Sequence, residues 1–464
     1  MSSRPNVLFV VVDDLRPQLG CYGVDWIQSP NIDSLAEDGL LFERAYCQQA
    51  ICGPSRCSVL SGCRPDTLGI FDLKTRLRDV DDELLTLPLA FKNAGYETLS
   101  VGKVYHHQND DPQGWSKPAY QTKGDWQGRG YLTDEAIEAM KEYAPVRAAR
   151  GDTRPGVGPA FEAADVDDEA YHDGKDATAC IEELQRLAKQ DTPFFMAMGF
   201  HKPHLPFIAP RRYWDLYDEA AVPLALNPYP PEGATPYSLT DYGELRGYFG
   251  MPREGPIPED LARKLVHGYA ACVSYMDAQF GRVLQALDEL ELRDNTVIVL
   301  WGDHGWKLGE HGSWCKHTNF EIDTRAPLIL GTPDTRSDGL RTSALVEFID
   351  IFPTLCDLCG VKIPETCEGT SLRPLLDDPQ RPWDKPAISL YPRGGNVMGY
   401  TLRTDRYRYT EWIDLATRAA KARELYDHEK DPGEDVNAVN HSEYGGTVAA
   451  LSAQLRRHTL GGTT

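Results

Sequence analysis

The stretch Val7-Leu8-Phe9-Val10-Val11-Val12-Asp13-Asp14 indicates the fold class of this chain. Six successive apolar residues, most of them β-branched, are typical of a strand that is buried on both faces. Similar runs occur at residues 98–101, 194–198 and 296–301, and segments with helical spacing lie between them, notably at 177–187 and 265–290. The alternation predicts an α/β fold, in which a large, mostly parallel sheet is covered by helices.

The pattern changes after about residue 364. Short strand-like runs broken by Gly, Asn and Asp occur at residues 387–391, 398–403 and 407–412, followed by a helical segment at 447–458. We therefore expect a large α/β domain over residues 1–365 and a smaller C-terminal antiparallel subdomain over 366–464.

Two long regions, residues 110–176 and 203–258, lack clear periodicity and are rich in Pro, Gly, Asp and aromatic residues. Long excursions of this kind inside a compact domain are more often functional loops than simple connectors. We expect them to contribute to a binding site.

Composition excludes several classes of function. The chain of 464 residues has 48 Lys and Arg against 70 Asp and Glu, a formal charge of −22, which argues against non-specific binding to nucleic acid or anionic membranes. An anionic substrate would need a local basic pocket. Eleven cysteines, an odd number in a long chain, make a complete disulfide framework unexpected.

No apolar run approaches the roughly 18 residues that a membrane span needs. The run at residues 7–12 is also shorter than the h-region of about 7–15 residues in a signal peptide. As given, the chain is expected to be cytoplasmic, or periplasmic or secreted if a signal has been removed. The oligomeric state stays open.

Polar side chains follow each of the four predicted strands. Because the carboxyl ends of parallel strands meet at one edge of a sheet, these side chains are expected to lie together where ligands bind in open α/β folds. Each has a structural explanation by itself: a turn or cap, a hydrogen-bonded histidine, a solvated lysine. Their coincidence at four strand ends predicts a functional site. The residues are Asp13 and Asp14, Lys103 and His106, His201, and Asp303 and His304.

The three aspartates of this set, Asp13, Asp14 and Asp303, offer the hard oxygen ligands that Ca²⁺ or Mg²⁺ requires. His304 is less expected for calcium and suits a softer metal, so the identity of the ion stays open. Sites with two metals normally need more Asp and His ligands than this set provides. One divalent ion is therefore expected.

Cys52 lies at a predicted helix start, since Pro54 suits a first helical residue and Gly62 can end the helix. The unpaired amides and the dipole of a helix N-terminus stabilise negative charge, so a cysteine there could have a lowered pKa and act as a nucleophile. The alternative is a small buried thiol that packs against the sheet, which is the commoner role of an isolated cysteine.

The run Cys52-Gly53-Pro54-Ser55-Arg56, followed by Leu60-Ser61-Gly62, resembles the sulfatase signature C-x-P-S-R-x-x-x-L-[ST]-G. In that family the cysteine is oxidised to formylglycine by a formylglycine-generating enzyme or an anaerobic maturase. The usual basic residue after Gly62 is displaced by one position, because Cys63 precedes Arg64. The resemblance implies an alkaline-phosphatase-like fold with a large mixed, mostly parallel sheet.

The resemblance extends over nearly the whole chain and is strongest to the iduronate-2-sulfatase branch of the family. Most sulfatases have Asp-Asn where this chain has Asp303-His304, and that branch shares the histidine. The long loops match less well. The other matching segments are Asp13-Asp14-Leu15-Arg16-Pro17, Ser29-Pro30-Asn31-Ile32-Asp33, Gly102-Lys103-Val104-Tyr105-His106, His201-Lys202-Pro203-His204, Gly305-Trp306, Leu308-Gly309-Glu310-His311-Gly312 and Lys316.

The resemblance implies a role for each candidate residue. The ligands of one divalent metal, Ca²⁺ or alternatively Mg²⁺ or another ion, would be Asp13, Asp14, Asp303, His304 and the formylglycine made from Cys52. Lys103 and Lys316 would stabilise the charge of the sulfate. His201, or Lys316 with it, would protonate the leaving alcohol, and His106 would deprotonate the second hydroxyl of the hydrated formylglycine. Arg56 would orient that group.

The activity that the resemblance implies is hydrolysis of a sulfate ester on a sugar. The acidic composition of the chain around a basic pocket favours a small or terminal saccharide over the interior of a long polyanion. One alternative is a phosphonate or phosphodiester hydrolase of the same superfamily, and another is a non-catalytic protein that binds sulfated glycans and is never modified at Cys52. Nucleotide-binding enzymes fit poorly, because the chain has neither G-x-G-x-x-G nor the glycine spacing of a P-loop.

Overall fold

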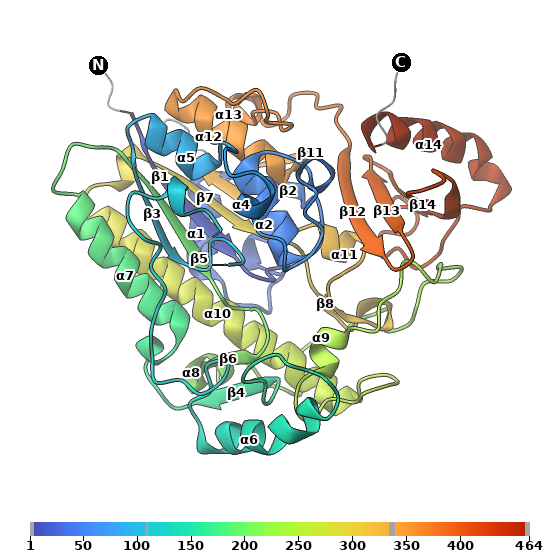
Figure 1. The fold of residues 1–464 in the computed structure, drawn as a ribbon, viewed down its shortest axis with the longest axis horizontal. Helices are drawn as coiled ribbons and strands as arrows, with labels where there is room; N and C mark the ends of the chain where they lie inside the picture. The colour runs from blue at the N-terminus through green and yellow to red at the C-terminus, as the bar shows by residue number, and fades with distance from the viewer. Residues whose placement is uncertain (1–3, 108–109, 334–338, 460–464) are drawn as a thin grey trace.

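The structure is a computed structural model that describes residues 4–107, 110–333 and 339–459. Its centre is a seven-stranded sheet in the order β11-β2-β10-β7-β1-β5-β3 (Figure 1). β1 pairs in parallel with β5 and β7, whereas β10 runs antiparallel to β2 and β7. The predicted mixed, mostly parallel sheet is confirmed. Its strands are β1 (Asn6–Val12), β2 (Leu40–Tyr46), β3 (Glu97–Gly102), β5 (Phe194–Phe200), β7 (Thr296–Gly302), β10 (Leu328–Gly331) and β11 (Leu340–Glu347).

The four strands predicted from the sequence, β1, β3, β5 and β7, are neighbours in the middle and at one edge of this sheet. Every residue of β1, β5 and β7 is buried, which explains why each appears in the sequence as a continuous apolar run. β2, β10 and β11 were not predicted.

Helices cover both faces of the sheet (Figure 1). Leu8, Val10 and Val12 of β1 pack in one apolar cluster, and Val7, Phe9 and Val11 pack in another on the opposite face. On the first face lie α1 (Pro30–Asp38), α7 (His172–Leu187) and α10 (Glu259–Glu289); on the second lie α2 (Cys52–Ser61), α5 (Leu87–Asn93), α12 (Ile351–Cys359) and α13 (Arg373–Asp377).

A separate four-stranded antiparallel sheet stands at the C-terminal side, as predicted (Figure 1). It consists of β12 (Ala387–Arg393), β13 (Val397–Arg403), β14 (Tyr407–Asp414) and β15 (Ala420–Asp427), with α14 (Gly445–Thr459) packed on it. The buried Arg408 of β14 joins this sheet to the main domain through Glu321 at 2.6 Å. A division at residues 365 and 366 remains a proposal.

The two aperiodic regions contain more regular structure than the sequence indicated. The first holds a 15-residue helix, α6, which was not predicted because only three of its residues are buried. The bounds of α6 are Asp134–Ala148, and the shorter elements here and elsewhere are α3 (Pro65–Leu68), α4 (Leu77–Val80), β4 (Phe161–Ala164), β6 (Phe207–Pro210), α8 (Arg211–Trp214), α9 (Gly243–Arg246), β8 (Lys307–Leu308), β9 (Trp314–Cys315) and α11 (Glu321–Thr324).

All eleven cysteines are free in the structure, ten of them buried and Cys367 partly exposed. Among the described residues, no helix is both long enough and apolar enough to cross a membrane.

Gly102, the last residue of β3, places Lys103 at the edge of the sheet and has φ +72°. A Cβ there would lie 2.3 Å from the carbonyl oxygen of Gly199 on β5. We expect Gly102→Ala to lower the free energy of unfolding by about 3 kcal/mol, because strain in the left-handed region adds to the clash. Gly69→Ala is the matched control, with φ +69° and open space around the Cβ, and should cost about 1 kcal/mol. Equal losses in chemical denaturation would contradict this account.

Candidate active site

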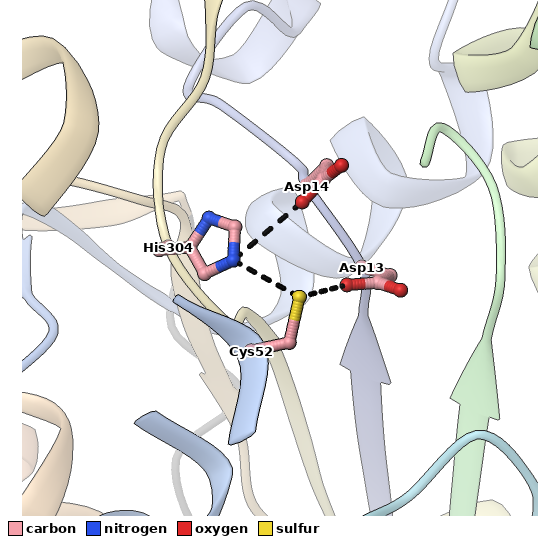
Figure 2. A group of neighbouring side chains, drawn as sticks. All are labelled: Asp13, Asp14, Cys52 and His304. Atoms are coloured by element: carbon pink, nitrogen blue, oxygen red, sulfur yellow. Dashed lines mark hydrogen bonds and ion pairs between the residues drawn. The ribbon is translucent and has the colours of Figure 1, made fainter. Parts of the chain in front are cut away.

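Four predicted residues meet at the carboxyl edge of the sheet (Figure 2). One ligand atom from each of Asp13, Asp14, Cys52 and His304 lies within 4.8 Å of the others, and all four residues are buried. Asp13 and Asp14 follow β1, His304 follows β7, and Cys52 begins α2. The helix therefore starts two residues before Pro54, where the sequence predicted its first turn, and Gly62 ends it in a left-handed conformation as expected.

The Cys52 sulfur is 3.1 Å from Asp13 Oδ1 and 3.3 Å from His304 Nε2. Burial raises the pKa of the thiol well above its usual value, and the neighbouring Asp13 carboxylate adds to the effect. The suggestion that a helix N-terminus lowers this pKa is thus wrong. Desolvation and a carboxylate at contact distance outweigh the helix dipole, whose contribution is modest. A thiolate nucleophile is disfavoured here.

Asp14 adopts a left-handed conformation with φ 60°, which is rare for a residue other than glycine. Its backbone N–H donates to Asp303 Oδ1 at 3.0 Å, and its carbonyl accepts a hydrogen bond from the Tyr269 hydroxyl at 2.9 Å. Strained backbone of this kind persists only where surrounding contacts hold it and is frequent at functional sites. The conformation turns the Asp14 carboxylate toward His304.

The donor set fits one divalent cation. His304 Nδ1 lies 2.9 Å from the carbonyl oxygen of Gly305 and donates to it, so Nε2 presents its lone pair to the cluster, as a metal ligand must. That nitrogen is 3.5 Å from Asp14 Oδ1 and 3.6 Å from Asp303 Oδ1. Burial raises the pKa of Asp14 to about 7, although Lys316 opposes this shift. A bound cation would relieve the cost of packing these carboxylates together.

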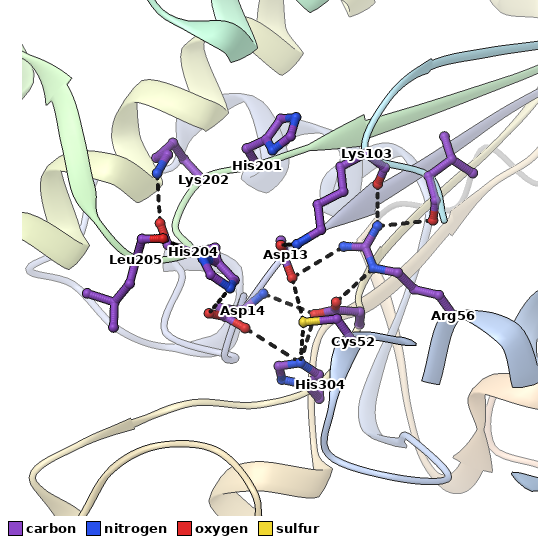
Figure 3. A network of polar contacts seen from close by, with 12 residues as sticks. Asp13, Asp14, Cys52, Arg56, Lys103, His201, Lys202, His204, Leu205 and His304 are labelled. Carbon is purple, nitrogen blue, oxygen red and sulfur yellow. Dashed lines mark hydrogen bonds and ion pairs between the residues drawn. The ribbon is translucent and has the colours of Figure 1, made fainter. Parts of the chain in front are cut away.

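Arg56 is fully buried and lies between two of the aspartates (Figure 3). Its Nε donates to Asp303 Oδ2 at 2.9 Å, and its Nη2 is 3.5 Å from Asp13 Oδ1. Its Nη1 donates to the carbonyl oxygens of Lys103 and Val104. The guanidinium thus ties the ends of three strands to α2, the helix that carries Cys52.

Two lysines complete the charge balance of the site. Lys103 Nζ bonds Asp13 Oδ2, and Lys316 Nζ bonds Asp14 Oδ1 at 2.9 Å. Burial alone would raise the pKa of Asp13, but Lys103, His204 and Arg56 together hold it well below its usual range. Because the chain as a whole is acidic, an anionic substrate was expected to need a local basic pocket. Lys103, Lys316 and Arg56 form such a local group of cations.

A cavity of 340 Å³ opens beside the cluster and is lined by Asp13, Lys103, His106 and His201. His106 and His201 are thus placed on its wall rather than in contact with Cys52. Burial lowers the pKa of His106 to about 3, and its Nδ1 is buried without a hydrogen-bond partner. Both aperiodic regions contribute lining residues, as expected of functional loops. A larger cavity of 610 Å³ lies apart from this site, between Tyr229, His311 and Gly433.

Two residues of the site had no predicted role. Glu244 of α9 reaches Lys316 Nζ at 3.1 Å and His204 Nε2 at 3.2 Å, so it holds both side chains. His204 belongs to a matching segment of the sequence, whereas Glu244 lies on a four-residue helix in an aperiodic region and gave no signal.

Solved structures share this fold. One is described as a complex with its substrate D-glucosamine-2-N,6-O-disulfate; its TM-score is 0.77 with 23% sequence identity, covering 98% of this chain and 97% of that one. A phosphonate monoester hydrolase of Agrobacterium radiobacter has a TM-score of 0.77 and 23% identity, covering 98% and 95%. Identities this low show the alkaline-phosphatase-like fold alone.

Relatives with higher sequence identity identify the family within this fold. Iduronate 2-sulfatase of Mus musculus is 35% identical over 525 residues, covering 96% of this chain and 93% of the relative. The human enzyme of the same name is 36% identical over 519 residues, covering 95% and 92%. The C-terminal family model described as N-sulphoglucosamine sulphohydrolase, C-terminal, matches residues 309–460. The family model described as Sulfatase matches residues 5–361, which hold the whole Cys52 cluster. The chain belongs to the sulfatase family and is a sulfuric ester hydrolase.

Proposed function

We propose that the chain removes sulfate from a small or terminal sulfated saccharide, in the manner of the iduronate 2-sulfatases that it resembles. The observation that carries this proposal is the position of Cys52, inside a cluster of acidic and basic groups next to a cavity of 340 Å³. Ligand pockets for small molecules span roughly 300–1,000 Å³, so this one suits a single sugar at a chain end.

The nucleophile in this proposal is a formylglycine made from Cys52. The sulfatase signature around Cys52 supports the modification, and the raised pKa of the thiol argues against the unmodified side chain as a nucleophile. The conversion replaces the thiol by an aldehyde, which adds water to give two hydroxyl groups on one carbon. A formylglycine-generating enzyme or an anaerobic maturase of the producing cell would carry it out.

The residues that would hold the metal are Asp13, Asp14, Asp303, His304 and the modified residue 52. When bound, the ion supplies Lewis-acid polarisation of the sulfate oxygens and of the nucleophile. Ca²⁺ is the expected ion because oxygen ligands dominate the set, and Mg²⁺ is the alternative.

The chain's own side chains carry out the remaining steps. One hydroxyl of the hydrated aldehyde attacks sulfur, and the bond from sulfur to the sugar oxygen breaks. Lys103 and Lys316 stabilise the negative charge on the sulfate, and His201, or Lys316 with it, delivers a proton to the leaving alcohol. Neutral His106 then accepts the proton of the second hydroxyl, which expels sulfate and regenerates the aldehyde.

Removal of the metal is expected to abolish activity and to weaken the fold. A ligand at 100 to 1,000 times its dissociation constant stabilises a protein by about 2.7–4.1 kcal/mol, so the chelated protein should lose stability of this order. Activity and thermal unfolding, measured before and after re-addition of Ca²⁺ or Mg²⁺, test this. Asp303→Asn removes one charged ligand of the metal, so re-addition of Ca²⁺ or Mg²⁺ should restore less activity and less thermal stability in this variant than in the wild type. Full activity in protein shown by elemental analysis to be free of metal would contradict the prediction.

The fold is shared with a phosphonate monoester hydrolase, so phosphoryl transfer is the second candidate. Release of sulfate from defined sulfated mono- and disaccharides, compared with hydrolysis of matched phosphodiesters, separates the two. We expect the larger kcat/KM for a sulfated saccharide. A larger value for the phosphodiester would reverse the assignment. Tight binding of sulfated sugars without release of sulfate, by protein whose Cys52 is never modified in the producing cell, would indicate a binding protein.

A further inference from the structure

Lys316, one of the two lysines proposed to stabilise the sulfate charge, lies between two residues with an unusual backbone conformation. It directly follows β9 and is 2% exposed. Cys315 has φ +67° and His317 has φ +86°, so both neighbours of the lysine adopt the left-handed conformation that residues other than glycine rarely take. Strain of this kind persists only where surrounding contacts hold the backbone. The contacts that hold residues 315 and 317 therefore decide where Lys316 points.

The main domain holds the first of these two positions. Cys315 of β9 pairs with Lys307 of β8 in a short antiparallel ladder. The Lys316 side chain that follows lies with its Nζ 2.9 Å from Asp14 Oδ1 and 3.1 Å from Glu244 Oε2. β9 ends at Cys315, so the ladder stops before residue 317. The second left-handed residue needs a different support.

The C-terminal sheet supplies a contact to His317. β12 is an edge strand of that sheet and stands next to the main domain (Figure 1). Its last residue, Arg393, donates from Nη2 to the carbonyl oxygen of His317 at 2.8 Å. Its Nε donates to the carbonyl oxygen of Tyr237, in the second aperiodic region, at 2.6 Å. One side chain of the C-terminal sheet thus joins two main-chain segments of the main domain.

The Arg393 guanidinium is itself held in place. Its central carbon lies 4.6 Å from the centre of the Tyr391 ring and 5.3 Å from the centre of the Trp412 ring. The Tyr237 ring stacks on Trp412 with centroids 5.8 Å apart. The remaining nitrogen, Nη1, donates to the carbonyl oxygen of Pro392 at 3.1 Å. Because all three nitrogens donate to main-chain oxygens, these contacts indicate that Arg393 positions the backbone.

We propose that Arg393 is a positioning residue: it holds the strained backbone at His317, so that the Lys316 ammonium stays directed at the sulfate site. The C-terminal sheet then contributes to catalysis through the main chain, without touching the substrate. A displacement of about 1 Å at a catalytic group can cost about 10²-fold in rate, so a hydrogen bond one residue away from the lysine is enough to matter. This inference rests on the proposed function, in which Lys316 stabilises the charge of the sulfate.

The first test is a double-mutant cycle with an aryl sulfate, whose good leaving group keeps slow variants measurable. Arg393→Met keeps an unbranched side chain but removes its donors, and should lower kcat/KM by about 10- to 100-fold. Arg393→Lys, which retains a donor, should recover part of this loss. In a Lys316→Met background, Arg393→Met should cost less than about threefold, because the group that it positions is already absent. Losses of equal size in both backgrounds would overturn the inference.

The second test measures the backbone directly and needs no turnover. Hydrogen exchange followed by mass spectrometry should show the amides of residues 315–319 exchanging at least about tenfold faster in Arg393→Met than in the wild type. Arg456→Met is the matched control, because Arg456 of α14 pairs with the buried Glu411 at 2.8 Å inside the C-terminal subdomain. It should keep both the wild-type exchange at 315–319 and the wild-type kcat/KM. Unchanged exchange in Arg393→Met, or equally fast exchange in both variants, would overturn the inference.

Failure of the inference can be told apart from failure of the proposed function. If the wild type released sulfate from no sulfate ester, the proposed function would fail, and hydrogen exchange would still decide whether Arg393 holds residues 315–319. If Lys316→Met kept full activity, the lysine would have no catalytic part and the inference would be overturned, while the assignment of Cys52 would stand.

Discussion

Cys52→Ala is expected to lose turnover of sulfate esters by on the order of 10⁴-fold or more, with the fold intact, since it removes the only precursor of the nucleophile. Cys52→Ser is expected to be equally inactive. Its hydroxyl can attack sulfur, but it lacks the second hydroxyl whose deprotonation would expel the sulfate. Release of sulfate under single-turnover and steady-state conditions measures both effects, with circular dichroism as the check on folding.

Cys57 gives the matched control for this prediction. It lies on the same helix, is buried to a similar extent as Cys52, and packs in the apolar cluster of that face. Cys57→Ala should keep kcat within a few-fold and cost only a modest amount of stability. Activity in Cys52→Ala close to that of Cys57→Ala would rule out residue 52 as the nucleophile.

Arg56→Met is expected to lower the free energy of unfolding by about 3–5 kcal/mol, because it removes the buried cation that pairs with two buried carboxylates, one of which keeps only Lys103 as a partner. These are Asp13 and Asp303, both fully buried. The same change should reduce kcat by about 10²-fold or more, because the hydrogen bonds that position the helix of Cys52 against the ends of the strands are lost. Chemical denaturation and kinetics at fixed metal concentration measure the two effects.

Added Ca²⁺ should restore part of the stability of Arg56→Met, because a divalent ion compensates the same carboxylates. Arg78→Met is the control: Arg78 pairs with the buried Asp111 at 2.5 Å, away from the Cys52 cluster. It should be destabilised without any rescue by Ca²⁺. Equal responses of the two variants to Ca²⁺ would show that Arg56 does not balance the charges of a metal site.

The sequence predicted those strands whose burial gives the clearest apolar pattern. β1, β5 and β7 are buried on both faces, so they are continuous apolar runs. β11 alternates irregularly between exposed and buried residues, and β10 has only four residues, so neither stands out from a loop. α6 exposes most of its surface and therefore lacks an apolar stripe. Tertiary pairing, rather than local pattern, defines these elements.

The candidate site was predictable where residues directly follow strands. Asp13, Lys103, His201 and Asp303 all follow predicted strands, and the structure brings Asp13, Lys103 and Asp303 to one edge of the sheet while His201 lines the adjoining cavity. Their roles in catalysis remain predictions. Glu244 could not be found in this way, because it reaches Lys316 from a short helix in a long loop. The prediction that the pKa of the Cys52 thiol is lowered was wrong for a related reason. The burial that raises this pKa arises from the packing of the whole structure and cannot be read from the local sequence.

The most direct test of this account is the mass of the peptide that contains residue 52, isolated from a preparation of known specific activity. The account predicts the mass of an aldehyde in place of the thiol, in a fraction of molecules that rises and falls with activity across preparations. Full activity in protein whose residue 52 remains entirely an unmodified cysteine would contradict it.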